Sequence, residues 1–124
     1  MHRRKLRTRL AVLAGALAIA SPAYAHHGWA DYQTEDSEVS GVVQSVELGA
    51  PHGVIKVKAA NGVWDLVLAP PAGIQRSGLE RSALPVGTQV TARGHRHNDP
   101  KRLEIKTERL VVGARTYDLY PDRR

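Results

Sequence analysis

The sequence predicts an all-β fold, a small OB-like barrel of five to six strands with one short helix between the third and fourth strands. Three observations favour it: apolar and polar residues alternate over several short segments, turn residues separate these segments, and a Pro-Pro pair that can begin a helix follows the third segment. An open β-sandwich with the same strand order is the main alternative. We expect the barrel to occupy residues 38–124.

The first half of the predicted domain supplies three strands. Residues 39–48 form a long β-rich segment, in which Gly41 predicts a bulge or a sharp bend that lets one strand serve both sides of a barrel. Residues 54–60 alternate between apolar and polar, as expected of a half-buried strand. The Asn-Gly pair at 61–62 is typical of a two-residue hairpin, so residues 63–69 form the returning strand.

The second half begins with the predicted helix. The Pro-Pro pair at 70–71 ends the third strand and can occupy the first turn of a helix over residues 72–77. Residues 88–97 and 103–112 follow as the fourth and fifth strands, and residues 116–120 as a sixth, shorter one. The predicted core residues are Ile55, Val57, Trp64, Leu66, Leu68 and Val90.

Residues 1–25 have the pattern of a secretory signal peptide. A basic segment without acids precedes an apolar run at residues 10–20, and residues 23–25, Ala-Tyr-Ala, supply the small residues that signal peptidase requires. The run is shorter than the roughly 20 residues needed to span a bilayer. We therefore expect cleavage before His26, a periplasmic or secreted location, and no membrane span after cleavage.

Removal of this segment changes the charge of the chain. Five of its 18 Lys and Arg residues but none of its 12 Asp and Glu residues lie there, which leaves a formal charge of +1. So small a net charge does not indicate a broad surface that neutralises phosphates. We therefore expect no nucleic-acid partner. The remaining residues, 26–124, suffice for one domain, which we expect to be a monomer with a polar arm at residues 26–37.

Four segments of the chain carry a resemblance to a known family. They are the His-His-Gly-Trp start at 26–29, the Pro-His pair at 51–52, the Gly-His-Arg segment at 94–96, and the Arg-Thr-Tyr-Asp-Leu-Tyr-Pro-Asp ending at 115–122. In combination they resemble a family of small exported bacterial proteins classed as a domain of unknown function. The resemblance implies export and a compact β domain, with no activity to carry over. The family pattern has Asn where this chain has Ala50, so no role can be assigned to that Asn here.

Five histidines remain after cleavage, and they are the candidate metal ligands: His26, His27, His52, His95 and His97. In an OB barrel the loops after strands one and four border the same face, so we expect His52 to approach the pair His95 and His97, which share one face of a strand. The arm is long enough to add the amino terminus. The α-amine and imidazole of His26, with one further imidazole, would resemble the histidine brace of copper enzymes.

We therefore expect an exported binding protein, rather than an enzyme, with a histidine-based Cu(II) or Zn(II) site. Tetragonal nitrogen coordination suits Cu(II), and a tetrahedral imidazole set suits Zn(II). The sequence has no Cys, no nucleophile elbow and no phosphate-binding Gly-rich loop, so covalent catalysis has little support. The alternative is a metal-independent module that binds an envelope protein or polysaccharide through the barrel face and a basic loop. The residues of this loop are Arg93, Arg96, Lys101 and Arg102.

Overall fold

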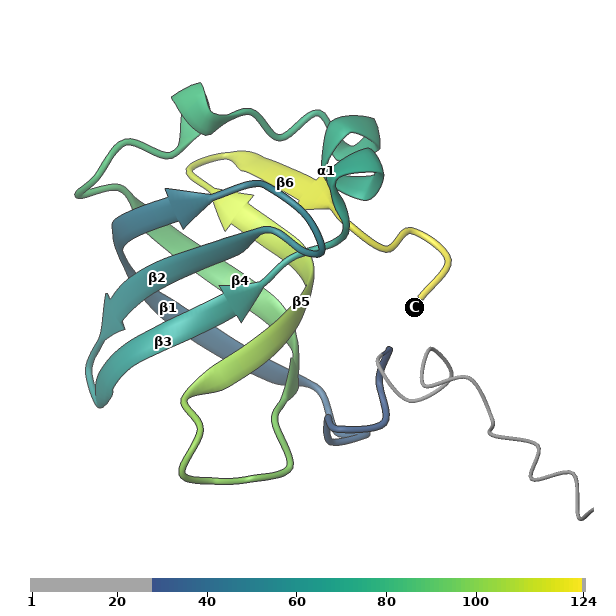
Figure 1. The fold of residues 1–124 in the computed structure, drawn as a ribbon. Helices are drawn as coiled ribbons and strands as arrows, with labels where there is room; N and C mark the ends of the chain where they lie inside the picture. Colours follow the sequence, from purple (N-terminus) through teal and green to yellow (C-terminus); the bar gives the residue numbers. More distant parts are fainter. Residues whose placement is uncertain (1–27, 124) are drawn as a thin grey trace, which may run out of the picture.

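The computed structural model describes residues 28–123, and these residues form the predicted small all-β barrel (Figure 1). The predicted signal peptide and the candidate ligands His26 and His27 lie outside the described residues. The strands are β1 (Ser37–Glu47), β2 (Val54–Ala59), β3 (Gly62–Val67), β4 (Gln89–Arg96), β5 (Glu104–Val112) and β6 (Arg115–Asp118). Between β3 and β4 lie α1 (Pro71–Ser77) and a single 3-10 turn, η2 (Arg81–Ala83).

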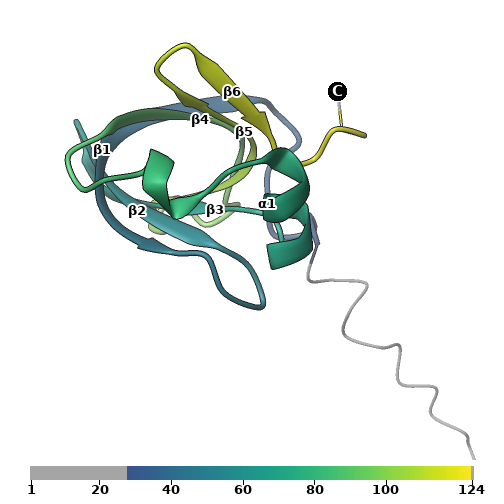
Figure 2. The same ribbon diagram turned by 90° about the horizontal axis from the view of Figure 1, so that it is seen from above.

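Five of the strands close into a ring in the order β1-β2-β3-β5-β4. Neighbouring strands in the ring are antiparallel, except that β3 and β5 run parallel where they close the barrel. β6 lies outside the ring and extends β5. Seen from above, the strands form a ring, and α1 and η2 lie over one end of it (Figure 2).

The alternating segments bury the side chains that the sequence places in the core. Of the six predicted core residues, Trp64 is the most exposed, at 3 %. Burial of side chains of this size stabilises a fold by about 1.5–3 kcal/mol each. Leu84, Ile105, Leu110 and Leu119 join the same cluster, so the core extends under η2, β5 and the C-terminal segment.

The connection between β3 and β4 contains the predicted helix and one further turn. Proline at the first position of α1 needs no backbone donor there, and Gly78 ends the helix in the left-handed conformation with φ 80°. Ile74 of α1 and Leu84 after η2 are buried, so both elements close the end of the barrel. Among residues 28–123, no helix is long and apolar enough to cross a membrane.

β1 pairs with both of its neighbours in the ring, β4 and β2. Its irregularity does not lie at Gly41, the residue that the sequence predicts. The strand pairs with β4 through residues 37–42 and with β2 through residues 42–47, and the irregularity lies between Val43 and Ser45 rather than at Gly41. Gly41 instead permits a close approach, because a Cβ there would lie 2.7 Å from the carbonyl oxygen of Lys58. The glycine therefore marks a backbone contact between strands.

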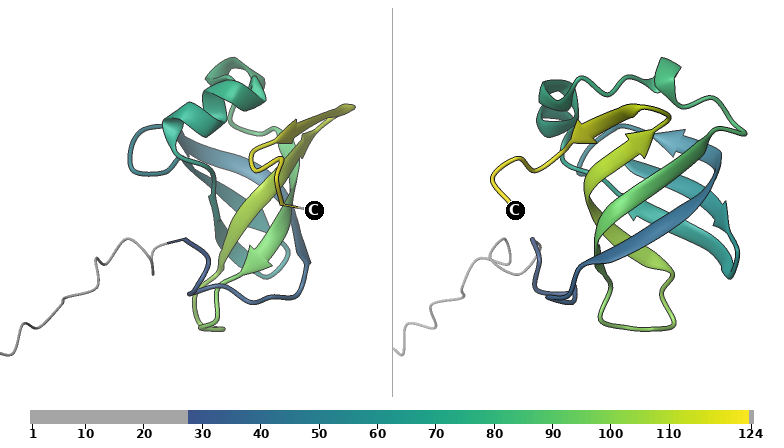
Figure 3. Two further views of the ribbon diagram at one scale, coloured as in Figure 1. Left: turned by 90° about the vertical axis from the view of Figure 1, so that its right-hand side faces the viewer. Right: turned by 180° about the vertical axis from the view of Figure 1, so that it is seen from behind.

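Both ends of the described chain lie on one side of the barrel, beside β5 (Figure 3). The arm, described here over residues 28–36, is attached to the end of β4 by the hydrogen bond from Gln33 N to the oxygen of Arg96. The tail, residues 119–123, begins with a hydrogen bond from Leu119 N to the oxygen of Glu108. Segments from opposite ends of the sequence thus cover the same strands.

Candidate functional site

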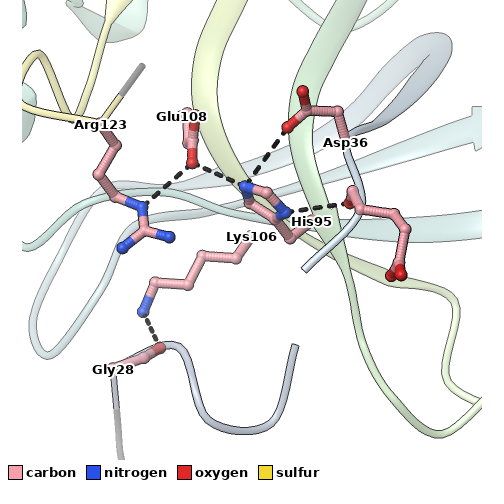
Figure 4. Close-up of polar contacts among 7 residues, drawn as sticks. Gly28, Asp36, His95, Lys106, Glu108 and Arg123 are labelled. Carbon is pink, nitrogen blue, oxygen red and sulfur yellow. Dashed lines mark hydrogen bonds and ion pairs between the residues drawn. The ribbon is translucent and has the colours of Figure 1, made fainter. Parts of the chain in front are cut away.

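The arm and the tail meet over polar side chains on the outer face of β4 and β5 (Figure 4). We call these side chains and the aromatic residues that cover them the arm–tail cluster. It consists of Trp29, Tyr32, His95, Lys106, Glu108, Tyr120 and Arg123.

A bulge in β5 shapes the base of the cluster. Arg93 pairs with Arg109 and Gly94 with Thr107, so Glu108 is the extra residue in the ladder. A bulge of this kind redirects the side chain of the extra residue. A Cβ on Gly94 would collide with the carbonyl oxygen of Lys106, so the two backbones can approach this closely only because residue 94 is glycine.

Both ring nitrogens of His95 are bound by protein acceptors. Nε2 lies 2.8 Å from Oε1 of Glu108, and Nδ1 lies 3.0 Å from the backbone oxygen of Glu35. A carboxylate and a carbonyl only accept hydrogen bonds, so the geometry is that of an imidazole that donates from both nitrogens. The ring is 6 % exposed and packs edge-on against Trp29. In this arrangement both ring nitrogens of His95 are engaged by protein oxygens.

Glu108 joins β5 to the tail. Its Oε1 accepts from His95 and also from Nε of Arg123, at 3.1 Å. The Arg123 guanidinium in turn lies over the ring of Trp29, with 3.8 Å between Cζ and the ring centroid. The Glu108 carboxylate thus binds one side chain from β4 and one from the tail. The guanidinium of Arg123 also covers Trp29 of the arm.

Lys106 is a buried lysine held by aromatic rings. The residue is 2 % exposed, and its Nζ donates to the carbonyl oxygen of Gly28 at 2.6 Å. Nζ lies 4.9 Å, 5.6 Å and 5.9 Å from the ring centroids of Trp29, Tyr32 and Tyr120. A cation over aromatic faces is stabilised by about 0.5–2 kcal/mol. Burial, and then the nearby Arg123 charge, lower the pKa of Lys106 below its ordinary value.

Tyr32 fastens the middle of the arm. Its hydroxyl donates to Oε2 of Glu104 at 2.7 Å, and its backbone forms an isolated β-bridge with His97. Burial, followed by this hydrogen bond and the charge of Glu104, raises the pKa of Tyr32 well above the ordinary value of a phenol. These contacts anchor the arm to the barrel at Tyr32.

His52 lies in the loop between β1 and β2, beside the end of β3. The loop is tied there by a hydrogen bond from Leu68 N to the oxygen of Gly53. Nδ1 of His52 is buried and has no hydrogen-bond partner. Burial, and then the nearby charge of Lys106, lower the pKa of His52, and a smaller opposing effect comes from a hydrogen bond to the backbone of Leu68. The lowered pKa favours the neutral imidazole, which is the form that binds metals.

The histidines do not converge in the way that the loop argument predicts. β1 and β4 are antiparallel, so the loop with His52 and the loop after His97 lie at opposite ends of the barrel. His97 packs against Tyr32, and its Nδ1 accepts from Asp99 N. Within the described part of the chain, no three His, Cys, Asp or Glu side chains come together as a group that could hold a metal.

Two of the four cations of the basic loop are paired with carboxylates within the protein. Arg93 binds Glu38 at 3.0 Å and Arg102 binds Glu104 at 3.0 Å. The guanidinium of Arg96 lies over the ring of Trp64, 4.9 Å from its centroid, and keeps its charge.

An open hollow of about 410 Å³ reaches the edge of the arm–tail cluster. Its lining residues are Thr34, Asp36, His95, Glu108, Asp122 and Arg123. His95 and Arg123 both bind Glu108 at the edge of this hollow. Asp36 is nearly fully exposed, and its carboxylate lies 3.7 Å from His95.

Sequence reasoning does not identify Lys106 and Arg123 as cluster residues. A lysine in an alternating strand predicts a solvent-facing side chain. The available signal is that aromatic residues occur at 29 and 32 and again at 117 and 120, and these side chains need a surface to cover. The structure shows that Trp29, Tyr32 and Tyr120 cover this lysine.

A five-stranded closed barrel with one added strand and a short helix places the protein among the small all-β barrels. The chain belongs to DUF6152, a family of unknown function whose model matches residues 14–106. This membership agrees with the expected resemblance to a family of unknown function. A comparison with curated proteins finds no match to the chain.

Proposed function

We propose that the protein is exported and, once its signal peptide is removed, binds Cu(II) or Zn(II) through His52 and the amino-terminal histidines His26 and His27. The observation that carries the proposal is the buried Nδ1 of His52, which lacks a hydrogen-bond partner. Leaving such an atom unpaired costs about 1–3 kcal/mol, and a bound ion is one of the few ways to compensate it.

The position of Gly28 supports the contribution of the amino terminus. Lys106 holds the carbonyl of Gly28, and the charge of Lys106 is close enough to His52 to lower its pKa. His26 and His27 directly precede Gly28 in the sequence. We therefore propose that they act together with His52.

The proposed ligand set differs from the one that the sequence suggests. His95 donates from both nitrogens, so in this arrangement it serves as a structural residue. His97 uses Nδ1 within its own turn and packs against Tyr32, at the other end of the barrel from the His52 loop. His52 with the amino terminus is the set that remains.

Cleavage before His26 would complete this set with a free α-amine. The amine, the imidazole of His26 and the imidazole of His52 would supply three nitrogens, and His27 lies next to them in the sequence. Nitrogen ligands in tetragonal geometry favour Cu(II), whereas a set of imidazoles alone would suit Zn(II).

Titration calorimetry on protein that begins at His26 tests the proposal. We expect saturable uptake of about one Cu(II) or Zn(II) per chain near neutral pH. Changing a residue that only orients a metal ligand weakens metal affinity by roughly 10–100-fold. Loss of a direct ligand should weaken it further, so His52→Ala should reduce the affinity by more than about 100-fold. His97→Ala is the matched control and should bind as the wild type does.

Two results would overturn the proposal. One is an absence of saturable uptake by the wild-type protein with its native start. The other is equal binding by His52→Ala and the wild type. The metal-independent envelope module would then replace the metal site.

A further inference from the structure

We infer that a second hollow, at the end of the barrel opposite to α1, binds a single oxyanion group, such as a carboxylate, phosphate or sulfate. It lies where the β2–β3 hairpin, the loop joining β4 to β5, and the arm meet (Figure 1). Its volume is about 160 Å³. Pockets for whole organic ligands hold roughly 300 Å³ or more, so this hollow suits one small group.

The polar side chains that line this hollow all donate hydrogen bonds, and none of them is acidic. Besides Trp64 they are Gln33, Asn61, Arg96, His97 and Arg102, and we call the hollow the donor hollow. Oδ1 of Asn61 accepts from Nε1 of Trp64 at 2.8 Å, so the amide nitrogen of Asn61 remains as a donor. Nδ1 of His97 accepts from a backbone N–H at 3.0 Å, which puts the hydrogen of the neutral ring on Nε2. Donors without a carboxylate are the groups that bind an oxyanion.

Arg96 supplies the charge of the donor hollow. Its guanidinium lies over the ring of the buried Trp64, 4.9 Å from the centroid. Stacking on a ring orders the guanidinium and leaves both its charge and its N–H donors available. The arm is tied to the same place, because Gln33 N donates to the oxygen of Arg96 at 2.8 Å. The two side chains are thus fixed next to each other before any ligand binds.

The balance of charge around the donor hollow favours an anion. Glu104 binds Arg102 at 3.0 Å, and Glu38 binds Arg93 at 3.0 Å. Among residues 28–123, Arg96 forms no ion pair with a carboxylate. One unpaired guanidinium beside neutral donors can bind an oxyanion by charge and by hydrogen bonds together.

The donor hollow is separate from the proposed metal site. β1 and β4 are antiparallel, so the loop with His52 lies at the other end of the barrel from the loop after His97. Anion binding can therefore be measured on metal-free protein. Its outcome does not depend on whether His52 binds a metal.

The experiment compares four metal-free proteins that begin at His26: the wild type, Asn61→Asp, Arg96→Gln and Lys101→Gln. Asn61→Asp keeps an acceptor for Trp64 and a turn pair that suits a hairpin, but it replaces the amide donor with a carboxylate. Arg96→Gln removes the unpaired guanidinium. Lys101→Gln is the matched control, because it removes a cation from the same loop at a residue that does not line the donor hollow.

Each protein is titrated with sodium phosphate, sulfate or acetate at constant ionic strength, and side-chain N–H signals are followed by NMR. We expect saturable shifts at Asn61, Arg96 and His97 in the wild type. The anion that binds most tightly distinguishes a tetrahedral oxyanion from a planar carboxylate. Loss of a hydrogen bond to a charged group weakens binding by roughly 10–100-fold, so Arg96→Gln and Asn61→Asp should each lose at least about tenfold. Lys101→Gln should bind as the wild type does.

Three results would overturn the inference. The first is a set of shifts that do not saturate with any of the three anions. The second is an equal loss of affinity in Lys101→Gln and Arg96→Gln, which would show that anions respond only to net charge. The third is unchanged binding by Asn61→Asp, which decides the matter even if Arg96→Gln fails to fold.

Discussion

His95 and Lys106 face each other directly across the β4–β5 ladder. Lys106 carries an ammonium group, and both ring nitrogens of His95 lie within hydrogen-bond distance of protein oxygens. The two side chains bind different partners: His95 binds Glu108, and Lys106 donates to the oxygen of Gly28 beneath aromatic rings. The arm is therefore part of the charge balance of the barrel wall, as well as its cover.

The bulge at Glu108 depends on glycine at residue 94. We expect Gly94→Ala to destabilise the fold by at least the roughly 1–3 kcal/mol typical of overpacking, because the new Cβ would collide with the backbone of Lys106. Urea unfolding measures the change. Gly49→Ala is the control, since a Cβ at Gly49 meets nothing within 4 Å. A Gly94→Ala protein as stable as the control would contradict this account of the bulge.

His95 is expected to matter for stability and not for metal uptake. His95→Ala leaves the oxygen of Glu35 without its donor and removes one of two donors to Glu108, which should cost about 1–3 kcal/mol. Thermal or urea unfolding checks the loss, and calorimetry should still find wild-type metal stoichiometry. Loss of metal with unchanged stability would return His95 to the ligand set.

The contribution of Tyr32 to stability should fall at high pH. A phenol has an ordinary pKa of about 10, and the pKa of Tyr32 is raised in the folded protein, so its contribution is complete below about pH 10 and is lost as pH rises toward the folded value. The difference in unfolding free energy between the wild type and Tyr32→Phe should therefore be larger at pH 8 than at about pH 11. An equal difference at both pH values would show that the hydroxyl does not titrate as its burial implies.

The free amino terminus should matter for copper and not for zinc. Mass spectrometry of the exported protein should show a chain that begins at His26. A variant with one extra residue before His26 should bind Cu(II) more weakly, since its α-amine is displaced, yet bind Zn(II) as the wild type does if zinc uses imidazoles alone. A retained signal peptide, or unchanged copper affinity in the extended variant, would remove the amine from the site.

The barrel follows from local patterns that are strong in this chain. The Asn-Gly pair at 61–62 and the Pro-Pro pair at 70–71 fix where strands end, and the alternation around Ile55 and Trp64 fixes which face is buried. Gly41 was interpreted as the bend, but the irregularity lies after Val43. A glycine that permits a bend and one that permits a close backbone contact look the same in a sequence.

The candidate site was less predictable because its parts come from the two ends of the chain. Lys106 is buried by residues 78 positions earlier, at Gly28, and by the tail. The alternation of apolar and polar residues within a strand cannot indicate a contact between residues so far apart in the sequence. His52 was identified from its loop, but the reason to favour it over His95 is hydrogen bonding: both nitrogens of His95 are bound, whereas Nδ1 of His52 is not.

The contact between Arg123 and Trp29 has a practical consequence for work on the purified protein. Because residues 28–36 and the tail meet beside β5, a change in either segment reaches the same cluster (Figure 3). A polyhistidine tag would add competing imidazoles to a metal titration, and a tag before His26 would block the α-amine of the proposed site. Tag-free material that begins at His26 is therefore the form in which a metal titration tests the proposed ligands.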